Sequence, residues 1–170
     1  CMPISWFAFF RAVQPCAASA LRRDKKMIVG ILKENKAEEN RVAMSPGGVE
    51  FMRQYGHTLL VEKDAGKSSG FGNARYQKAG AEVMGSARDI FARADMIMRV
   101  KEPQPHEFAF MREGQIYFAY LHLAASQKMT QAMVRAGSVN VAYETIQKPD
   151  GSLPLLTPMS EVAGPMAIQQ

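Results

Sequence analysis

Cysteine is scarce in this chain, and both cysteines lie near its beginning. Cys1 and Cys16 are the two cysteines among 170 residues, so the rest of the chain has no thiol for a disulfide framework or a thiolate metal site. No histidine pair has the spacing of metal ligands either, so we expect no bound metal. The composition suits a reducing compartment, and we expect a cytoplasmic protein.

Long apolar runs are also lacking. No segment approaches the ~20 consecutive apolar residues that cross a bilayer, so we expect no membrane-spanning helix. The apolar run that begins at Met2 is short for a secretory signal and has no basic segment before it. Residues 1–26 hold too little serine for a transit peptide. We therefore expect residues 1–26 to be a leader that is non-native or disordered.

Positive charge is in excess, but it is not spread over the chain. The formal net charge is +5, and the leader contributes +4 of it. The nearly neutral remainder has no basic stripe and no basic residues interleaved with aromatic ones, which are the features of a nucleic-acid-binding surface. We therefore exclude nucleic acid as a partner. The charged residues of the leader are Arg11, Arg22, Arg23, Asp24, Lys25 and Lys26.

Several enzyme motifs are missing as well. The sequence has no Walker loop with its lysine and serine, and no nucleophile elbow. The glycine-rich segment 66–72 follows a predicted strand and precedes a predicted helix, as a dinucleotide-binding loop does. However, Arg75 occupies the place of the third glycine in G-x-G-x-x-G. We interpret this segment as a glycine-rich turn and not as a phosphate-binding loop.

The sequence does contain an alternation of apolar strands and capped helices. Serine precedes predicted helices at Ser45, Ser86 and Ser126, and glycine follows them at Gly56 and Gly137. Repeated strand-helix-strand units predict an α/β fold with a mainly parallel sheet and helices on both faces, of the Rossmann-like or flavodoxin-like kind. The predicted strands are residues 28–32, 58–62, 96–100, 115–121 and 139–143, and the predicted helices are residues 46–55, 73–79, 86–94 and 126–136.

Polar residues follow several of these strands, where a parallel sheet gathers its ligands. Lys101 and His122 each follow a predicted strand, and Arg41 lies in the segment after the first. Two cations and an imidazole with a reference pKa of ~6.5 suit a small oxo-acid and proton exchange. Each residue also has an ordinary explanation. Arg41 can pair with Glu38 or Glu39 in solvent, while Lys101 can simply end a strand and His122 can be a hydrogen-bonded core residue.

Five motifs in order, from Met27 almost to the end of the chain, resemble the amino-terminal part of the alanine dehydrogenase family. The related pyridine nucleotide transhydrogenases share the opening motif but do not carry the Tyr-Leu-His-Leu-Ala pattern at this place, so His122 favours the dehydrogenases. The motifs are Glu39-Asn40-Arg41-Val42-Ala43, the glycine-rich residues 66–72, Val100-Lys101-Glu102-Pro103, Tyr120-Leu121-His122-Leu123-Ala124 and residues 153–164.

The resemblance implies an enzyme that interconverts L-alanine and pyruvate plus ammonium with NAD, and that forms a hexamer as a full-length chain. It implies that Arg41 binds the substrate carboxylate and that Lys101 contacts the carboxylate or the keto oxygen. It also implies that His122 is the acid/base residue. These roles agree with the residue types, because a guanidinium clamps a carboxylate directionally and a lysine is a compact cation.

By the same resemblance, Tyr120, Leu156 and Met159 wall the substrate and nicotinamide region, and Ser160 contacts the dinucleotide. Ordinary core packing and a helix cap explain these four residues equally well. In particular, the sequence around residues 157–161 reads as the start of a helix, where Ser160 can serve locally.

The resemblance also divides the chain. We expect residues 27–152 to form an incomplete substrate domain and residues 153–170 to form a linker and the start of a helix toward an NAD-binding domain absent from this chain. Pro165 stands where relatives have arginine, and a proline inside a helix costs ~3 kcal/mol. A kinked linker and a local sequence error both explain it. We expect this piece alone to bind pyruvate weakly, to bind NAD poorly and not to turn over.

Two other functions stay open. The shared opening motif also suits a transhydrogenase-like nucleotide module coupled to a membrane partner, which would exchange hydride between nucleotides and ignore alanine. The expected absence of the NAD-binding domain also suits a non-catalytic remnant that binds a small molecule.

Overall fold

The computed structural model describes residues 26–169, so the expectations for residues 1–25 lie outside the described residues. The strands are β1 (Ile28–Ile31), β2 (Thr58–Glu62), β3 (Glu82–Met84), β4 (Met96–Met98), β5 (Ile116–Ala119) and β6 (Val139–Ala142). The α-helices are α1 (Pro46–Gln54), α2 (Asn73–Lys78), α3 (Ala87–Arg93), α4 (Gln127–Ala136) and α5 (Thr157–Gln169). Short 3-10 helices are η1 (Lys67–Ser69), η2 (Pro105–Phe110), η3 (Leu123–Ala125) and η4 (Tyr143–Thr145).

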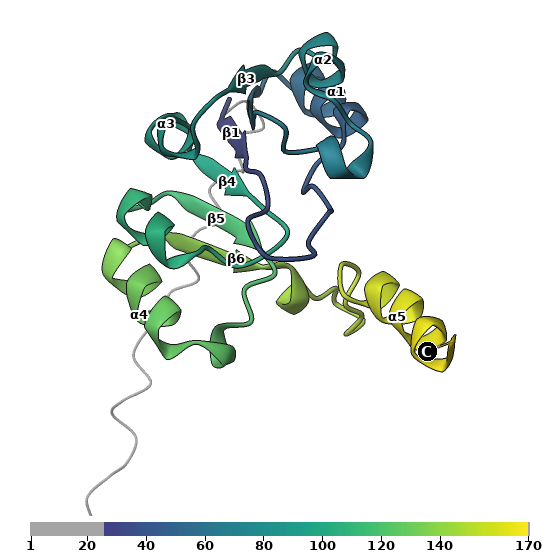
Figure 1. The fold of residues 1–170 in the computed structure, drawn as a ribbon. Coiled ribbons are helices and arrows are strands. Elements are labelled where there is room, and N and C mark those ends of the chain that lie inside the picture. Colours follow the sequence, from purple (N-terminus) through teal and green to yellow (C-terminus); the bar gives the residue numbers. More distant parts are fainter. Residues whose placement is uncertain (1–25, 170) are drawn as a thin grey trace, which may run out of the picture.

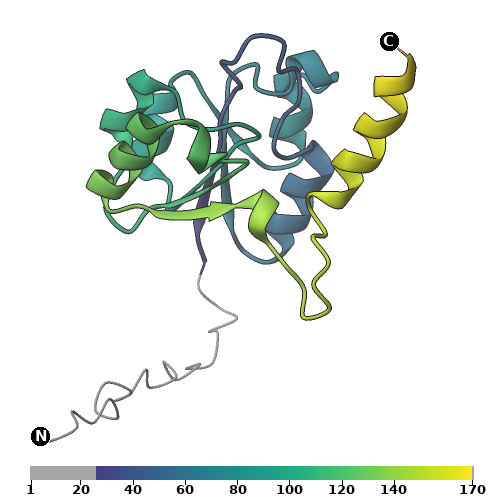
Figure 2. The same ribbon diagram turned by 90° about the horizontal axis from the view of Figure 1, so that it is seen from below.

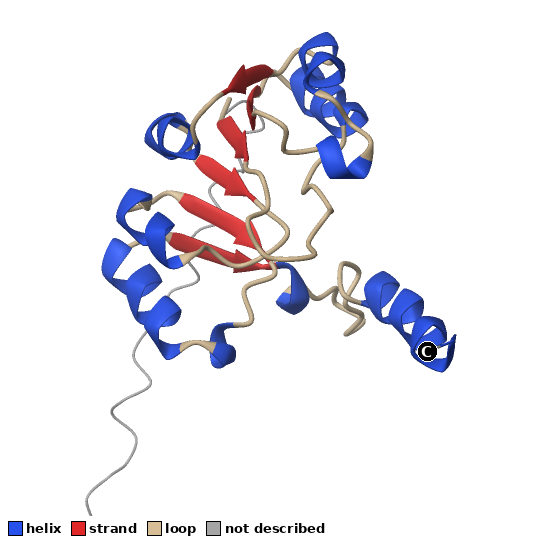
Figure 3. Cartoon of the chain, in the orientation of Figure 1, coloured by secondary structure: helices blue, strands red, loops and turns tan. Residues whose placement is uncertain are grey.

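The strands form one six-stranded sheet in the order β3-β2-β1-β4-β5-β6, and every neighbouring pair is parallel. From β1 the chain moves outward to β3, then crosses to β4 and moves outward on the other side to β6 (Figures 1 and 3). The order therefore reverses between β1 and β4, where sheets of this kind bind ligands beyond the carboxyl ends of their strands. The predicted α/β fold with a parallel sheet is confirmed.

Apolar side chains on the two faces of the sheet form two separate cores. Figure 1 shows α1 and α2 on one face and α3 and α4 on the other. Along β2, Leu60 belongs to the core under α3 and α4, whereas Leu59 and Val61 belong to the core under α1 and α2. A strand buried on both faces reads as a continuous apolar run. The prediction of helices on both faces is therefore confirmed as well.

Serine side chains begin three of the helices, as the sequence predicts. Ser45, Ser86 and Ser126 each accept a hydrogen bond from the backbone amide three residues on, at 3.3, 3.4 and 3.3 Å. Such a bond satisfies one of the free amides at a helix start and contributes about 1 kcal/mol. At the end of α4, Gly137 has φ 64°, the left-handed conformation that glycine adopts without strain.

The sequence pattern misses one strand at an edge of the sheet and extends four strands one or two residues too far. It predicts no strand between residues 80 and 86, yet β3 pairs there with β2. This strand is only three residues long, and its polar Glu82 pairs with Arg93 at 2.6 Å. The strands predicted at 96–100 and 115–121 end earlier, at Met98 and Ala119. Two backbone hydrogen bonds still join the segments beyond these ends, from Arg99 to Phe118 at 3.1 Å and from Tyr120 to Val100 at 3.0 Å.

The last helix, α5, extends from the edge of the sheet (Figures 1 and 2). Pro165 lies inside it, where its ring cannot donate the backbone hydrogen bond of an ordinary helical residue. The helix nevertheless continues to Gln169. None of the helices between residues 26 and 169 is both long and apolar enough to cross a membrane.

Candidate functional site

The carboxyl ends of β1, β4 and β5 bring the three predicted polar residues to one edge of the sheet. Arg41 lies in the long segment between β1 and α1, Lys101 lies three residues beyond the end of β4, and His122 lies three residues beyond β5. Because β1 and β4 are neighbours at the point where the strand order reverses, their loops meet there. The strand order therefore brings together the loops that carry these residues, as the sequence predicts.

A pocket of ≈ 550 Å³ opens at this edge, between the segment before α1, the ends of β4 and β5, and the beginning of α5. Three of the predicted site residues line it, namely Arg41, Tyr120 and Met159. The rest of its wall is mostly apolar, which is typical of small-molecule sites. The remaining lining residues are Val42, Ala43, Ser45, Ser69, Phe71, Met98, Val100, Phe118, Tyr143 and Leu155.

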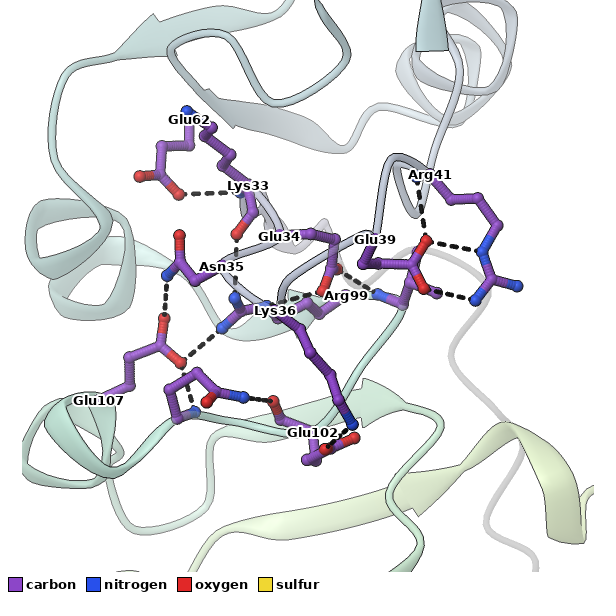
Figure 4. Close-up of polar contacts among 12 residues, drawn as sticks. Lys33, Glu34, Asn35, Lys36, Glu39, Arg41, Glu62, Arg99, Glu102 and Glu107 are labelled. Atoms are coloured by element: carbon purple, nitrogen blue, oxygen red, sulfur yellow. Dashed lines mark hydrogen bonds and ion pairs between the residues drawn. The ribbon is translucent and has the colours of Figure 1, made fainter. Parts of the chain in front are cut away.

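Arg41 is the charged side chain in the pocket wall, and Glu39 holds it in place. Its Nε and Nη2 donate to the two carboxylate oxygens of Glu39 at 2.7 and 2.5 Å (Figure 4). Its Nη1 points to the Met159 sulfur at 3.7 Å. The hydrogen bond from Arg41 is the largest cause that holds the pKa of the Glu39 carboxyl below its usual range. The predicted pairing with an acid in this segment is confirmed, and its partner is Glu39.

Lys101 lies near the same acid but not in the pocket wall. Its positive charge also helps to lower the pKa of Glu39, after the bonds and the charge of Arg41. The amide of the residue before it, Val100, donates to the Glu34 carboxylate at 2.7 Å. The Glu39 carboxylate is therefore influenced by two cations, Arg41 and Lys101. The sequence motif shows that Glu39 is near Arg41 but gives no sign of the influence of Lys101.

Tyr120 connects the end of β5 to the segment before α5. Its hydroxyl donates to the carbonyl oxygen of Leu155 at 2.6 Å, and its ring lies 4.9 Å from that of Tyr143 in an edge-on arrangement. Burial raises the pKa of the Tyr120 hydroxyl, and the charge of Arg41 opposes that change. Tyr120 thus fixes one wall of the pocket and stays neutral at physiological pH.

His122 has an unusual backbone. Its φ of 46° and ψ of 47° place it in the left-handed region, which costs roughly 1–2 kcal/mol for a residue other than glycine. The residue is exposed, and its imidazole has no hydrogen-bond partner among residues 26–169. Its charge is one of the smaller influences on the pKa of Glu102, a carboxylate that pairs with Lys36 at 2.8 Å. The hypothesis of a hydrogen-bonded core histidine is wrong.

Leu156 and Ser160 do not line the pocket. The carbonyl oxygen of Leu156 accepts bonds from the amides of Met159 and Ser160 at 3.1 and 3.2 Å, so it serves the first turn of α5. The Ser160 hydroxyl reaches the same carbonyl at 3.4 Å and remains exposed. Leu155, one residue earlier, lines the pocket instead. The pocket wall therefore includes Leu155 and Met159 but not Leu156.

A buried ion network lies beside the site and was missed by sequence reasoning. Arg99 has no exposed surface, and its Nη1 donates to Glu107 at 2.5 Å while Nη2 donates to the carbonyl oxygen of Lys33 at 3.0 Å (Figure 4). Its Nε lies 3.5 Å from Glu34. Burial alone would lower the pKa of Arg99, but Tyr117, Glu107 and Glu34 raise it. The sequence sign of this network is an arginine directly after a buried strand, where a charged side chain needs buried partners.

The glycine-rich segment forms η1 and the entry to α2. A Cβ on Gly66 would lie 2.6 Å from the Tyr76 hydroxyl, so packing requires glycine there. That hydroxyl donates to the carbonyl oxygen of Met44 at 2.8 Å, and burial raises its pKa to about 12. The predicted turn is confirmed. Within residues 26–169, no group of three or more His, Cys, Asp and Glu side chains is arranged to hold a metal ion.

These features define a class of protein: a doubly wound parallel α/β domain with a largely apolar pocket, walled by an arginine and aromatic rings, at the carboxyl edge of its sheet. The family model "Alanine dehydrogenase/PNT, N-terminal domain" matches residues 30–163. This chain belongs to that family.

Individual relatives agree with the family model. Alanine dehydrogenase from Staphylococcus saprophyticus is 50% identical over 143 residues, which are 84% of this chain and 38% of the relative. A solved L-alanine dehydrogenase superimposes with a TM-score of 0.80 at 45% identity, over 84% of this chain and 39% of that one. A transhydrogenase from Sinorhizobium meliloti gives 0.64 at 35% identity, over 69% and 33%. The chain thus spans well under half the length of these relatives.

Proposed function

We propose that this chain supplies the substrate-binding and acid/base residues of an alanine dehydrogenase, which interconverts L-alanine and pyruvate plus ammonium with NAD. The observation that carries the proposal is the position of Arg41 in the pocket wall. Glu39 takes its Nε and Nη2 edge, and Nη1 remains on the side of Met159. Since a guanidinium has five N–H donors, this second edge is available to a substrate carboxylate.

The other cation and the imidazole take the remaining roles of the reaction. Lys101 is proposed to contact the carboxylate or keto oxygen of pyruvate, and His122 to give and take the proton at the reacting centre. Histidine is the side chain that most often serves as a general acid and base, because one ring nitrogen can donate a proton while the other accepts one. Tyr120 and Met159 are proposed to wall the substrate region, which their place in the pocket supports. Leu156 is proposed for the same wall by resemblance alone.

NAD, when bound, accepts or supplies the hydride of this reaction. Ser160 is the residue of this chain that we assign to the dinucleotide, because its hydroxyl is exposed and has only a 3.4 Å contact to the carbonyl of Leu156. That hydroxyl can turn toward a phosphate or ribose without breaking a strong bond. We propose that most contacts to NAD come from the longer part of the relatives' length that this chain does not match.

We further propose the organisation and setting of the protein. Residues 27–152 form the substrate domain, and residues 153–170 form the linker and the first part of a helix toward an NAD-binding domain. The complete protein is proposed to be a hexamer in the cytoplasm. The absence of cysteine after Cys16 supports a reducing compartment.

A hybrid enzyme tests the proposal. The matching 143-residue segment of this chain replaces its counterpart in the Staphylococcus saprophyticus alanine dehydrogenase, and the rate of NADH oxidation is measured with pyruvate and ammonium. We expect activity in this hybrid and its loss on His122→Ala. His106→Ala is the matched control, because His106 is an exposed histidine on η2, away from the pocket lining. An inactive hybrid that folds, or an unchanged rate in His122→Ala, would contradict the proposal.

A second experiment separates the alternative of a transhydrogenase-like module, which the likeness to the Sinorhizobium meliloti protein favours. A nucleotide module would bind a dinucleotide and be indifferent to pyruvate. Titration of this chain with pyruvate, followed by the backbone amide signals of Arg41 and its neighbours, distinguishes the two. We expect weak but specific shifts around the pocket with pyruvate and few with NAD.

A further inference from the structure

The conformation of His122 needs an explanation, because little in its own side chain supports it. His122 is one of three non-glycine residues with positive φ among residues 26–169, together with Glu38 and Asp64. Residues in sparsely populated backbone regions persist when the surrounding structure over-determines them, and they gather at functional sites. The imidazole is exposed and has no hydrogen-bond partner in the described part of the chain. Its direction is therefore set by the backbone.

The Glu144 carboxylate holds that backbone. Its Oε1 accepts from the amide of His122 at 2.8 Å and from the amide of Leu121 at 3.1 Å, and its Oε2 lies 3.3 Å from the same Leu121 amide. Two consecutive amides that point the same way form a concavity that binds anions. A carboxylate fills such a concavity with charge-assisted bonds, which are stronger than bonds between neutral groups.

The sheet places these two segments side by side. β5 and β6 are parallel neighbours, and their last paired residues are Ala119 and Ala142. The segments that follow β5 and β6 leave the sheet at the same edge, so Glu144 on η4 lies next to the amides of Leu121 and His122. The sequence separation between the acid and the histidine is 22 residues, so the contact depends on the fold and not on local turn chemistry.

We propose that Glu144 is a positioning residue, which fixes the left-handed backbone of His122 and thereby the direction of its imidazole. The inference rests on the proposed function, in which His122 exchanges the proton. Glu144 touches the backbone of His122 and does not line the pocket. Glu144 thus acts through His122, and its removal leaves the imidazole in place but changes its direction.

Amide hydrogen exchange on this chain tests the clamp directly. In Glu144→Ala we expect exchange at Leu121 and His122 to accelerate roughly tenfold or more, since each loses a hydrogen bond, while the strands keep their protection. If Glu144→Ala does not fold, Glu144→Asp replaces it in the test. This variant keeps the charge but retracts the carboxylate by one methylene, and we expect exchange at the same two amides to accelerate. Glu144→Gln keeps an acceptor oxygen, and most of the protection returns. Glu50→Ala, an exposed acid on α1, is the control.

Kinetics in the hybrid enzyme then test the consequence. We expect kcat to fall by up to about 100-fold in Glu144→Ala, the scale of a misplaced catalytic group, with the KM for pyruvate near the parent value and partial rescue by Glu144→Gln. Unchanged exchange at the two amides would overturn the inference whatever the enzyme does. Accelerated exchange with unchanged kcat, in a hybrid that His122→Ala inactivates, would overturn the inference and leave the proposed function intact. Full activity in His122→Ala would overturn both.

Discussion

Two arginines lie at the same edge of the sheet in opposite surroundings. Arg99 has no exposed surface and binds groups from distant parts of the sequence, among them the carbonyl of Lys33, 66 residues away. Arg41 has a side chain that is 47% exposed, and its ion partner Glu39 is only two residues away. Figure 4 shows the two clusters side by side.

The same arginine–carboxylate pairing thus serves two purposes. A buried arginine that binds groups from several chain segments fixes the loops that follow β1 and β4, because leaving its charge unpaired in the interior is costly. An arginine paired locally keeps its orientation without using all of its donors, and the pocket retains a charged edge for a ligand. Arg99 is therefore a structural residue and Arg41 is the candidate ligand-binding residue.

The largest expected effect comes from breaking the buried network. Arg99→Met leaves the carboxylates of Glu34 and Glu107 buried without their cation, and we expect the free energy of unfolding to fall by about 3–5 kcal/mol. Urea unfolding, followed by circular dichroism, measures it. Arg93→Met is the control, because its pair with Glu82 is exposed and its loss should change little. Equal midpoints for the two variants would show that the buried network does not stabilise the fold.

The next effect is on ligand binding. Arg41→Lys keeps the charge but loses the planar edge, so we expect little change in unfolding and a rise in the KM for pyruvate of roughly 10- to 100-fold, the scale of a lost charged hydrogen bond. The hybrid enzyme provides the measurement. Arg53→Lys, on the exposed surface of α1, is the matched control. A KM that does not move would remove Arg41 from the binding site and erase the contrast with Arg99.

The sequence was sufficient for the starts of three helices, because these depend on local chemistry. Ser45, Ser86 and Ser126 cap helices through bonds to amides three residues away, which a sequence pattern displays. The convergence of Arg41 and Lys101 could also be predicted, since parallel strands share one carboxyl edge.

The buried network and the clamp on His122 could not be predicted in the same way. Arg99 meets Glu34 and the carbonyl of Lys33 only because β1 and β4 are neighbours, and the sequence does not state which strands pair. Glu144 is recognisable in the sequence as a polar residue after a strand, but its hydrogen bonds to the Leu121 and His122 amides depend on the left-handed backbone of His122. A glycine in the sequence would have indicated such a backbone, and a histidine does not. The three-residue strand β3 is too short to show a period.

The last prediction concerns the pH dependence of stability, to which two carboxylates contribute with opposite signs because their pKa values shift in opposite directions. Burial raises the pKa of Glu34 above 4.5, against the charge of Arg99, whereas the bond from Arg41 lowers the pKa of Glu39 below 4.5. Glu34 therefore binds its proton more tightly in the folded state, and its contribution to stability is present below pH 4.5 and is lost as pH rises through its folded pKa. Glu39 contributes above pH 4.5 and loses that contribution as pH falls through its folded pKa.

Carboxyl carbon NMR titration of Glu34 and Glu39 checks this prediction, and the variants Glu34→Gln and Glu39→Gln connect it to stability. We expect Glu34→Gln to flatten the decline in unfolding free energy above pH 4.5 and Glu39→Gln to flatten the loss below it. If both carboxyls titrated on the same side of 4.5, the buried and the exposed arginine would act on their acids alike. The opposite signs follow only if desolvation outweighs ion pairing beside Arg99, while ion pairing outweighs desolvation beside Arg41.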